Sequence, residues 1–163
     1  MLNQIPSFYP CSSDYAFTYL NTPKVQKALH ANISGSLPGP WQDCNPILRN
    51  WTDHPYTAVL PLIKKLMGSG TISIWIYSGD VDGLIPVTAT KYSMAKIGAP
   101  VKTPWFSWYS HGEMGGYAVG YENVTFLTIR GAGHDFVASY QPQRAFTFFS
   151  SFLQRKLPPR DIN

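Results

Sequence analysis

Apolar residues recur along the chain in two patterns, one typical of helices and one typical of buried strands. Residues 57–67 place apolar side chains at helical spacing, and Gly68 and Gly70 follow directly, which predicts an amphipathic helix that ends there. Residues 71–77 (TISIWIY) and 124–129 (VTFLTI) are continuous runs of β-branched and aromatic residues. These two runs predict strands that are buried in a parallel sheet.

Further helices and a hairpin complete the pattern. Thr22 and Pro23 have the residue types of a helix start, and a helix over residues 24–30 is predicted behind them. A last helix over residues 143–154 gathers its apolar residues on one face, namely Ala145, Phe146, Phe149 and Phe152. The other predicted elements are helices over 14–20 and 87–97 and hairpin strands over 101–109 and 117–121. Because helices and strands alternate, the sequence predicts an α/β fold with a parallel sheet.

Composition and charge narrow the class of protein. The 163 residues are 44% hydrophobic and 13% charged, which predicts one globular domain over residues 1–163. The net charge is +4, but the basic residues are scattered, so we expect no nucleic-acid partner. No apolar run is long enough to span a membrane. The two cysteines, Cys11 and Cys44, form no CxxC motif, and we expect no metal and no organic cofactor.

Three N-x-[ST] triplets favour a secreted, glycosylated protein. Their asparagines are Asn32, Asn50 and Asn123. The first residues, MLNQIPSFYPCSS, have neither the charged start nor the apolar stretch of a signal peptide. We therefore expect either a mature chain or one cut from a longer precursor.

Polar loops follow both predicted buried strands. Asp80 and Asp82 come after the first strand, and His134 comes after the second. Reacting groups gather at the carboxyl ends of strands in open α/β sheets, so these residues are candidates for one site. An acid followed by a histidine is the second half of the order Ser…Asp…His, in which the acid orients the imidazole and the imidazole takes a serine proton. Two structural alternatives stay open: Asp82 caps the following helix, and Asp80 holds its own turn.

Several segments together resemble one known family. The sequence is similar to the serine carboxypeptidases, with the closest likeness to the plant carboxypeptidase-like group, and the likeness covers essentially the whole chain. The segments that carry it are YSGDVDGLIP (77–86), RGAGH (130–134), ALHAN (28–32), PWFSWY (104–109) and EMGGY (113–117). The resemblance implies an α/β-hydrolase fold, with Asp82 as the catalytic acid and His134 as the general base. It also implies a peptide substrate from which the C-terminal residue is removed.

The resemblance implies a partner chain as well. No G-x-S-x-G motif occurs here, so the nucleophilic serine is expected on a larger N-terminal chain, to which this chain would be the C-terminal small chain. In similar two-chain enzymes, cysteines at corresponding positions bridge to the large chain, which implies two interchain disulfides for Cys11 and Cys44; pairing with each other is the alternative. A secreted or vacuolar location and a dimer of heterodimers are further expectations from the family.

The histidine segment departs from the family pattern. The usual H-x-V-P-x-x-x-P is one residue longer here, and Ala138 stands where proline is usual. This loop borders the substrate pocket in similar enzymes, so Asp135 is a candidate substrate contact, with a solvated loop residue as the alternative. Three other functions stay open: an acyltransferase that uses sugar esters, a hydroxynitrile lyase, and an inactive binding homologue.

Overall fold

The computed structural model describes residues 12–32, 34–35, 38–43, 45, 55–134 and 137–161. The chain forms two compact units. One unit is Tyr9–Asp53, and the other joins Met1–Phe8 to His54–Asn163.

The smaller unit contains the two predicted short helices. Helix α1 spans Ser12–Leu20, and α2 spans Pro23–Ala28 with Pro23 in its first turn, as the sequence predicts. Asn21, between the helices, accepts the backbone N–H of Trp41 at 2.7 Å and donates its amide to the Trp41 carbonyl at 2.8 Å. This double hydrogen bond ties the returning loop to the junction of the two helices.

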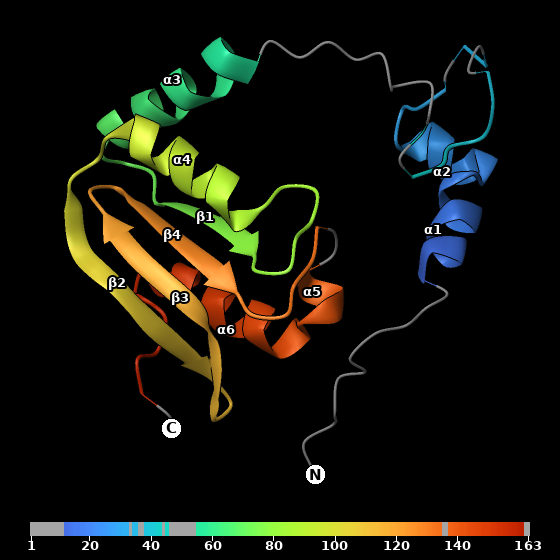
Figure 1. Ribbon diagram of the computed structural model, residues 1–163. Coiled ribbons are helices and arrows are strands. Elements are labelled where there is room, and N and C mark those ends of the chain that lie inside the picture. The colour runs from blue at the N-terminus through green and yellow to red at the C-terminus, as the bar shows by residue number, and fades with distance from the viewer. Residues whose placement is uncertain are drawn as a thin grey trace. The chain divides into compact units, whose positions relative to one another are not determined.

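The larger unit is built on a four-stranded sheet in the order β1-β4-β3-β2 (Figure 1). The strands are β1 (Ile74–Gly79), β2 (Val101–Ser110), β3 (Glu113–Tyr121) and β4 (Val124–Ile129). Strands β1 and β4 pair in parallel as predicted, whereas the other two pairs are antiparallel. The sheet within this chain is therefore mixed rather than mostly parallel.

A two-residue turn explains the antiparallel half of the sheet. His111 and Gly112 connect β2 to β3, and both have left-handed backbones with φ of 52° and 78°. Two positive φ angles in succession match the twist of a tight hairpin. Such a short connection permits only antiparallel pairing, so the predicted hairpin is confirmed with longer strands and a shorter turn.

Helices cover both faces of the sheet (Figure 1). On one face, α3 (Pro55–Gly68) and α4 (Val87–Ile97) contribute to a core with Val119, Val124 and Phe126 of the sheet. On the other face, α6 (Pro142–Leu153) packs Ala145 and Phe148 against a core that contains Trp108 and Leu127. A short helix α5 (Val137–Tyr140) precedes α6, where the sequence indicated only a loop.

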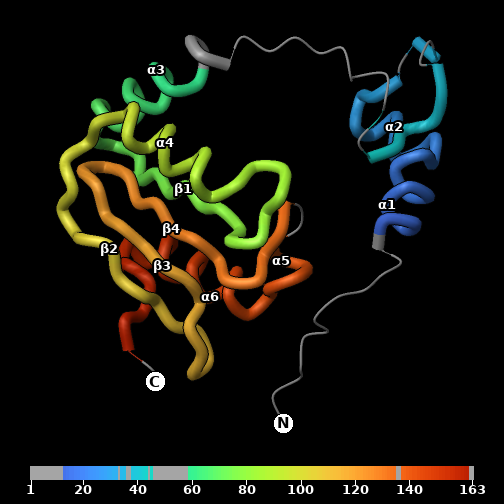
Figure 2. The backbone as a smooth tube through the Cα atoms, viewed as in Figure 1, coloured from blue at the N-terminus to red at the C-terminus, as the bar shows by residue number. Residues whose placement is uncertain are grey.

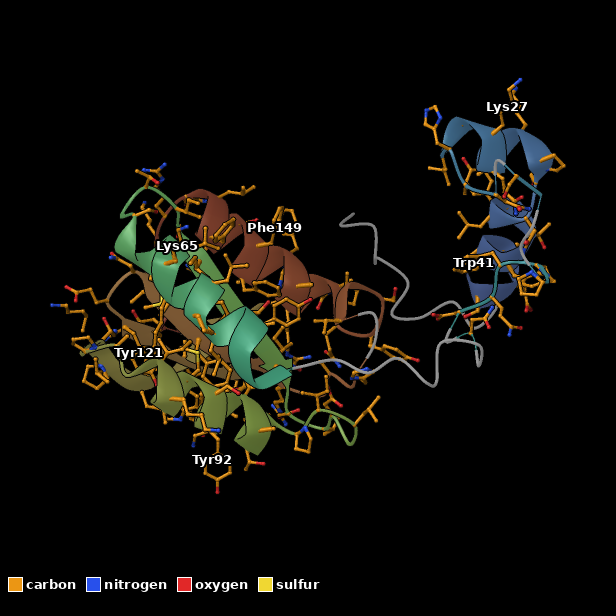
Figure 3. The ribbon with its side chains drawn as sticks, turned by 90° about the horizontal axis from the view of Figure 1, so that it is seen from above. Lys27, Trp41, Lys65, Tyr92, Tyr121 and Phe149 are labelled. Carbon is orange, nitrogen blue, oxygen red and sulfur yellow. The ribbon has the colours of Figure 1, made fainter. Side chains whose placement is uncertain are left out.

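The face that α6 buries differs from the predicted one. Phe146 is 67% exposed and Phe149 is 52% exposed, although both were expected among the packed residues. Ala145, which was expected on the packed face, and Phe148, which was not, contact the core. Figure 3 labels Phe149 on α6.

No helix in the described part of the chain is long and apolar enough to cross a membrane.

Candidate active site

The loops that follow β1 and β4 lie side by side at the carboxyl-terminal end of these two strands (Figure 2). The parallel register sets Gly79, the last residue of β1, opposite Ile129, the last residue of β4. Beyond the strands, the Asp80 N–H donates to the Ile129 carbonyl at 3.1 Å, and the Val81 N–H donates to the Ala132 carbonyl at 3.2 Å. The two loops are thus linked by backbone hydrogen bonds.

Close packing at Gly79 makes this contact possible. A Cβ atom at Gly79 would lie 2.2 Å from the Ala132 carbonyl oxygen and 2.7 Å from that of Gly133. Both obstacles are backbone atoms, which have no rotamer through which to move away. A residue without a side chain is therefore required for the two loops to approach this closely.

Asp80 links the two loops rather than holding its own turn. Its Oδ1 accepts the backbone N–H of Gly131 at 2.7 Å, across to the loop that carries His134. The alternative of a local backbone role for Asp80 is therefore wrong. Gly131 has φ of 71°, a left-handed conformation that glycine adopts without strain.

The side chains of Asp82 and His134, which are 52 positions apart in the sequence, meet between these two loops. The Asp82 Oδ2 lies 3.2 Å from the His134 Nδ1. The Asp82 side chain is 8% exposed and that of His134 is 35% exposed. The other oxygen of Asp82, Oδ1, accepts the backbone N–H groups of Leu84 and Ile85, each at 2.8 Å. The carboxylate orientation is thus fixed from both sides.

Asp82 is not the cap of the following helix. Helix α4 begins at Val87, with Pro86 at the N-cap position and no side-chain capping bond. The bonds to Leu84 and Ile85 hold the intervening loop instead. The helix-cap alternative for Asp82 is therefore wrong.

The hydrogen bonds also set the charge of Asp82. Burial of the carboxyl by itself raises its pKa, but the N–H groups of Ile85 and Leu84 and the nearby His134 outweigh that effect, so the pKa of Asp82 lies below its usual value of 3.8. Asp82 is therefore an ionised acceptor near neutral pH. Because an ionised carboxylate only accepts hydrogen bonds, His134 Nδ1 carries the hydrogen, and Nε2 is the ring nitrogen suited to take a proton.

The other predicted site residues fall into two groups. Cys11, Cys44, Asn50 and Asp135 lie outside the residues that the structure describes. Asn32 is exposed, and so is Asn123, which lies in the turn between β3 and β4 and donates its side-chain amide to the Met67 carbonyl at 3.0 Å.

Three residues that the sequence patterns did not single out support the loop that carries His134. Gln141 donates its amide to the Gly131 carbonyl at 3.0 Å. Arg144 on α6 donates to the Gln141 side chain and to Glu113 on β3, the latter at 2.8 Å. Uncharged Gln141 carries no signal of its own in the sequence, and no spacing rule connects Arg144 to a loop ten or more positions earlier.

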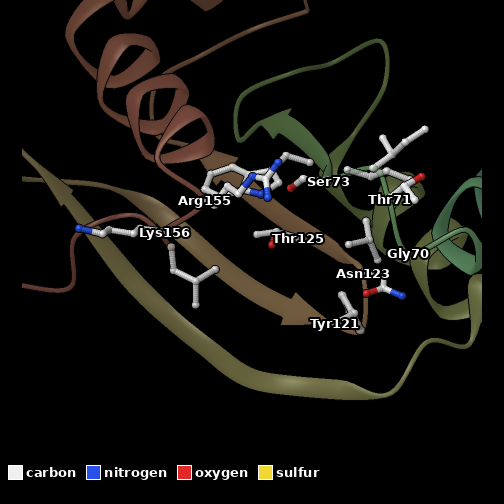
Figure 4. A pocket seen from close by; sticks show the side chains of 13 residues that line it. Gly70, Thr71, Ser73, Tyr121, Asn123, Thr125, Arg155 and Lys156 are labelled. Atoms are coloured by element: carbon white, nitrogen blue, oxygen red, sulfur yellow. The ribbon is translucent and has the colours of Figure 1, made fainter.

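The described residues offer little to hold a metal ion. No three His, Cys, Asp or Glu side chains among them come close enough together to bind one. A cavity of about 310 Å³ lies at the opposite end of the sheet, where it is lined by residues 70–75, Asn123 and Arg155 (Figure 4). Since β1 and β4 begin there and end at the Asp82–His134 pair, this cavity is separate from the candidate site.

Comparison with known proteins gives close relatives. Over 150 residues the chain is 51% identical to serine carboxypeptidase-like 40 of Arabidopsis thaliana, which covers 91% of this chain and 29% of the relative. It is 43% identical to serine carboxypeptidase 24 of the same plant over 157 residues, which covers 96% of this chain and 33% of the relative. The chain thus spans about a third of the length of the curated relatives that it matches.

The fold has a match among solved structures. The crystal structure of Kex1(delta)p, a prohormone-processing carboxypeptidase from Saccharomyces cerevisiae, superposes with a TM-score of 0.64 over 90% of this chain and 32% of that chain. The sequences are 19% identical, so this likeness bears on the fold alone. Residues 2–155 match the family described as serine carboxypeptidase. From this match and the plant relatives, the chain belongs to the serine carboxypeptidase family.

Proposed function

We propose that this chain supplies the acid and the base of a serine carboxypeptidase whose nucleophilic serine lies on another chain. The observation that carries the proposal is the 3.2 Å contact between Asp82 Oδ2 and His134 Nδ1, with the remaining carboxylate oxygen held by two backbone N–H groups. This arrangement orients an imidazole and stabilises its protonated form, which are the two tasks of the acid in a catalytic triad.

The proposed reaction is hydrolysis of the last peptide bond of a substrate. The serine oxygen attacks the carbonyl carbon while His134 Nε2 takes the serine proton, and Asp82 stabilises the resulting imidazolium. His134 then gives that proton to the leaving amine, which breaks the C–N bond and leaves an acyl-enzyme. A water molecule, deprotonated by His134, attacks the ester and releases the shortened peptide, and the proton returns to the serine.

The geometry favours an active protein over an inactive homologue. The longer segment after His134 accommodates helix α5, and His134 still contacts Asp82. Acyl transfer from a sugar ester would use the same pair with an alcohol in place of water, and a hydroxynitrile lyase would also need an oriented base. No described residue favours either of these over hydrolysis, which the family membership supports.

The nucleophilic serine is expected on a larger partner chain. We propose that this partner contacts two surfaces, the unpaired side of β1 and the exposed side of α6. Among the described residues, β1 pairs with a neighbour on one side only, which leaves a sheet edge available. Helix α6 has apolar residues on its packed face and also exposes Phe146, Phe149 and Leu153, three or four residues apart. An exposed apolar stripe of this kind is typical of a surface that another chain covers.

The partner is expected to be a disulfide-linked large chain. Cys11 and Cys44 would form the two links, and two such heterodimers would assemble in the complete protein. We place the protein outside the cell or in the vacuole, with glycans on Asn32, Asn50 and Asn123, in keeping with its sequons and its family.

A serine-directed fluorophosphonate probe tests this function in the complete protein. We expect one serine of the large chain to be labelled, with labelling slowed by about a thousandfold or more in His134→Ala, as is typical of the loss of a triad member. His111→Ala changes an exposed histidine of the β2–β3 turn and serves as the control. Equal labelling of His134→Ala and the parent, or no labelling of the folded parent, would contradict the proposal. Release of C-terminal residues from peptides then distinguishes hydrolysis from acyl transfer.

A further inference from the structure

The backbone of Gly131 is held from two sides. Its N–H donates to the Asp80 carboxylate at 2.7 Å, and its carbonyl accepts the Gln141 amide at 3.0 Å. Gly131 lies three residues before His134, in the same loop. The first contact belongs to the joined loops at the site, whereas the second comes from the segment that leads into α6. Gln141 therefore connects the position of that loop to the rest of the fold.

Arg144 decides which way the Gln141 amide points. A guanidinium group only donates hydrogen bonds, so the Gln141 atom that faces it must be the oxygen. The amide nitrogen is then turned toward the Gly131 carbonyl, where it is needed as a donor. Arg144 is held in turn by the Glu113 carboxylate at the start of β3, at 2.8 Å. The orientation of one amide is thus set by a chain of contacts that ends on the hairpin.

Neither residue is placed to stabilise its own helix. Arg144 lies in the first turn of α6, where the helix dipole disfavours a positive charge. Its side chain is 17% exposed, and its Nε is buried without a hydrogen-bond partner. Gln141 occupies the N-cap position of α6 but makes no side-chain capping bond. Burial of a cation carries a cost in free energy. The Glu113 carboxylate pairs with Arg144, and Arg144 orients the Gln141 amide that contacts the histidine loop.

We propose that Gln141 is a positioning residue for His134, with Arg144 and Glu113 fixing its amide. The inference rests on the proposed function, since it assigns Gln141 the task of holding the loop where His134 meets Asp82. A loop released at Gly131 lets the imidazole drift, and small displacements of a catalytic group cost large factors in rate. The effect appears in the chemical step and leaves substrate affinity unchanged, because Gln141 is proposed to act only through the loop.

Two variants of Gln141 separate its donor role from its bulk. Gln141→Met keeps the length and removes the amide, while Gln141→Glu keeps an acceptor for Arg144 and removes the donor to Gly131. In the complete protein, we expect both to lower kcat and the rate of fluorophosphonate labelling by about tenfold, with KM unchanged. Gln143→Met, on the exposed side of the same helical turn, is the matched control and retains the parent rates.

Amide hydrogen exchange gives a readout that does not depend on activity. We expect residues 130–134 to exchange about fivefold faster in Gln141→Met and in Arg144→Met, as the loss of one hydrogen bond implies, with no change in Gln143→Met. Unchanged exchange and unchanged labelling in both Gln141 variants would overturn the inference. If the parent protein takes no label, the proposed function fails, and exchange alone then decides whether Gln141 holds the loop.

Discussion

At the residue scale, the candidate site depends on how Asp82 divides its two oxygens. One accepts two backbone N–H groups of its own loop, and the other faces the imidazole of His134. Backbone donors are fixed by the fold and need no rearrangement when His134 becomes charged. The same bonds hold the pKa of Asp82 below its usual value, despite burial that raises it. The carboxylate is therefore ready to stabilise an imidazolium across the neutral and mildly acidic range.

The lowered pKa of Asp82 predicts how stability depends on pH. A carboxyl whose pKa is lower in the folded than in the unfolded state stabilises the fold above its unfolded pKa of about 4, and this stabilisation is lost as the pH falls through the folded pKa. Urea unfolding of the complete protein at pH 7, 5 and 3 should show a stability difference between Asp82→Asn and the parent that shrinks at pH 3. Asp161→Asn, at an exposed position, is the control, and a difference for Asp82→Asn that is equal at all three pH values would argue against the assignment.

At the element scale, the parallel pair β1 and β4 creates the site. Side by side and in the same direction, the strands deliver their following loops to the same end of the sheet. Three hydrogen bonds then join the loops, two between backbones and one through the Asp80 carboxylate. Gln141 adds a bond within the segment that follows β4. The antiparallel hairpin of β2 and β3 adds a brace, since Glu113 anchors Arg144. The α3 and α4 layer supplies the core beneath β1 and β4.

The close approach of the loops predicts the effect of adding one methyl group. Gly79→Ala places a Cβ against the Ala132 carbonyl at 2.2 Å, so the loops must separate. We expect a loss of about 1–3 kcal/mol in the free energy of unfolding, as for other overpacked sites, together with slower probe labelling. Gly83→Ala is the matched control, because a Cβ there meets no atom within 4 Å. Similar stability of the two variants would show that the loops tolerate separation.

At the scale of the whole molecule, the chain exposes apolar surface that the proposed partner chain would bury. Phe146, Phe149 and Leu153 are 67%, 52% and 65% exposed along one side of α6, and Tyr77 on β1 is 50% exposed. Contiguous apolar surface of this kind marks an interaction site in soluble proteins. Together with the unpaired side of β1, it supports a large partner chain on the α6 face of the sheet.

This exposed stripe predicts how the chain assembles with the proposed partner chain. Phe149→Lys should weaken assembly with the large chain about tenfold or more, because a buried aromatic residue contributes on the order of 2 kcal/mol and an unpaired charge adds a further cost. Lys65→Glu is a control that changes the charge at an exposed position on a different helix, α3. Co-purification of the two chains, quantified by light scattering, measures the effect. Unimpaired assembly of Phe149→Lys would remove the α6 face from the interface.

The predictability of the elements follows from what each pattern contains. Helix α4 and strand β4 have the predicted bounds because their patterns are local. Gly98 follows the last residue of α4 directly, and Gly131 follows β4 two residues after its end. Strand β1 begins three residues later than predicted. The buried face of α6 was predicted correctly at Ala145 and wrongly at Phe146 and Phe149, because the apolar residues of this helix extend beyond the side that packs on the sheet.

The sequence by itself determined the order of helices and strands, the hairpin, and the two loops that carry Asp82 and His134, since all of these rest on local patterns. Only the tertiary structure decided that the two residues meet, that Asp80 reaches across to Gly131, and that Gln141 braces the same loop. These contacts join positions 10 to 52 apart. They depend on the register of β1 against β4 and on the close approach at Gly79, which are properties of packing that no local pattern encodes.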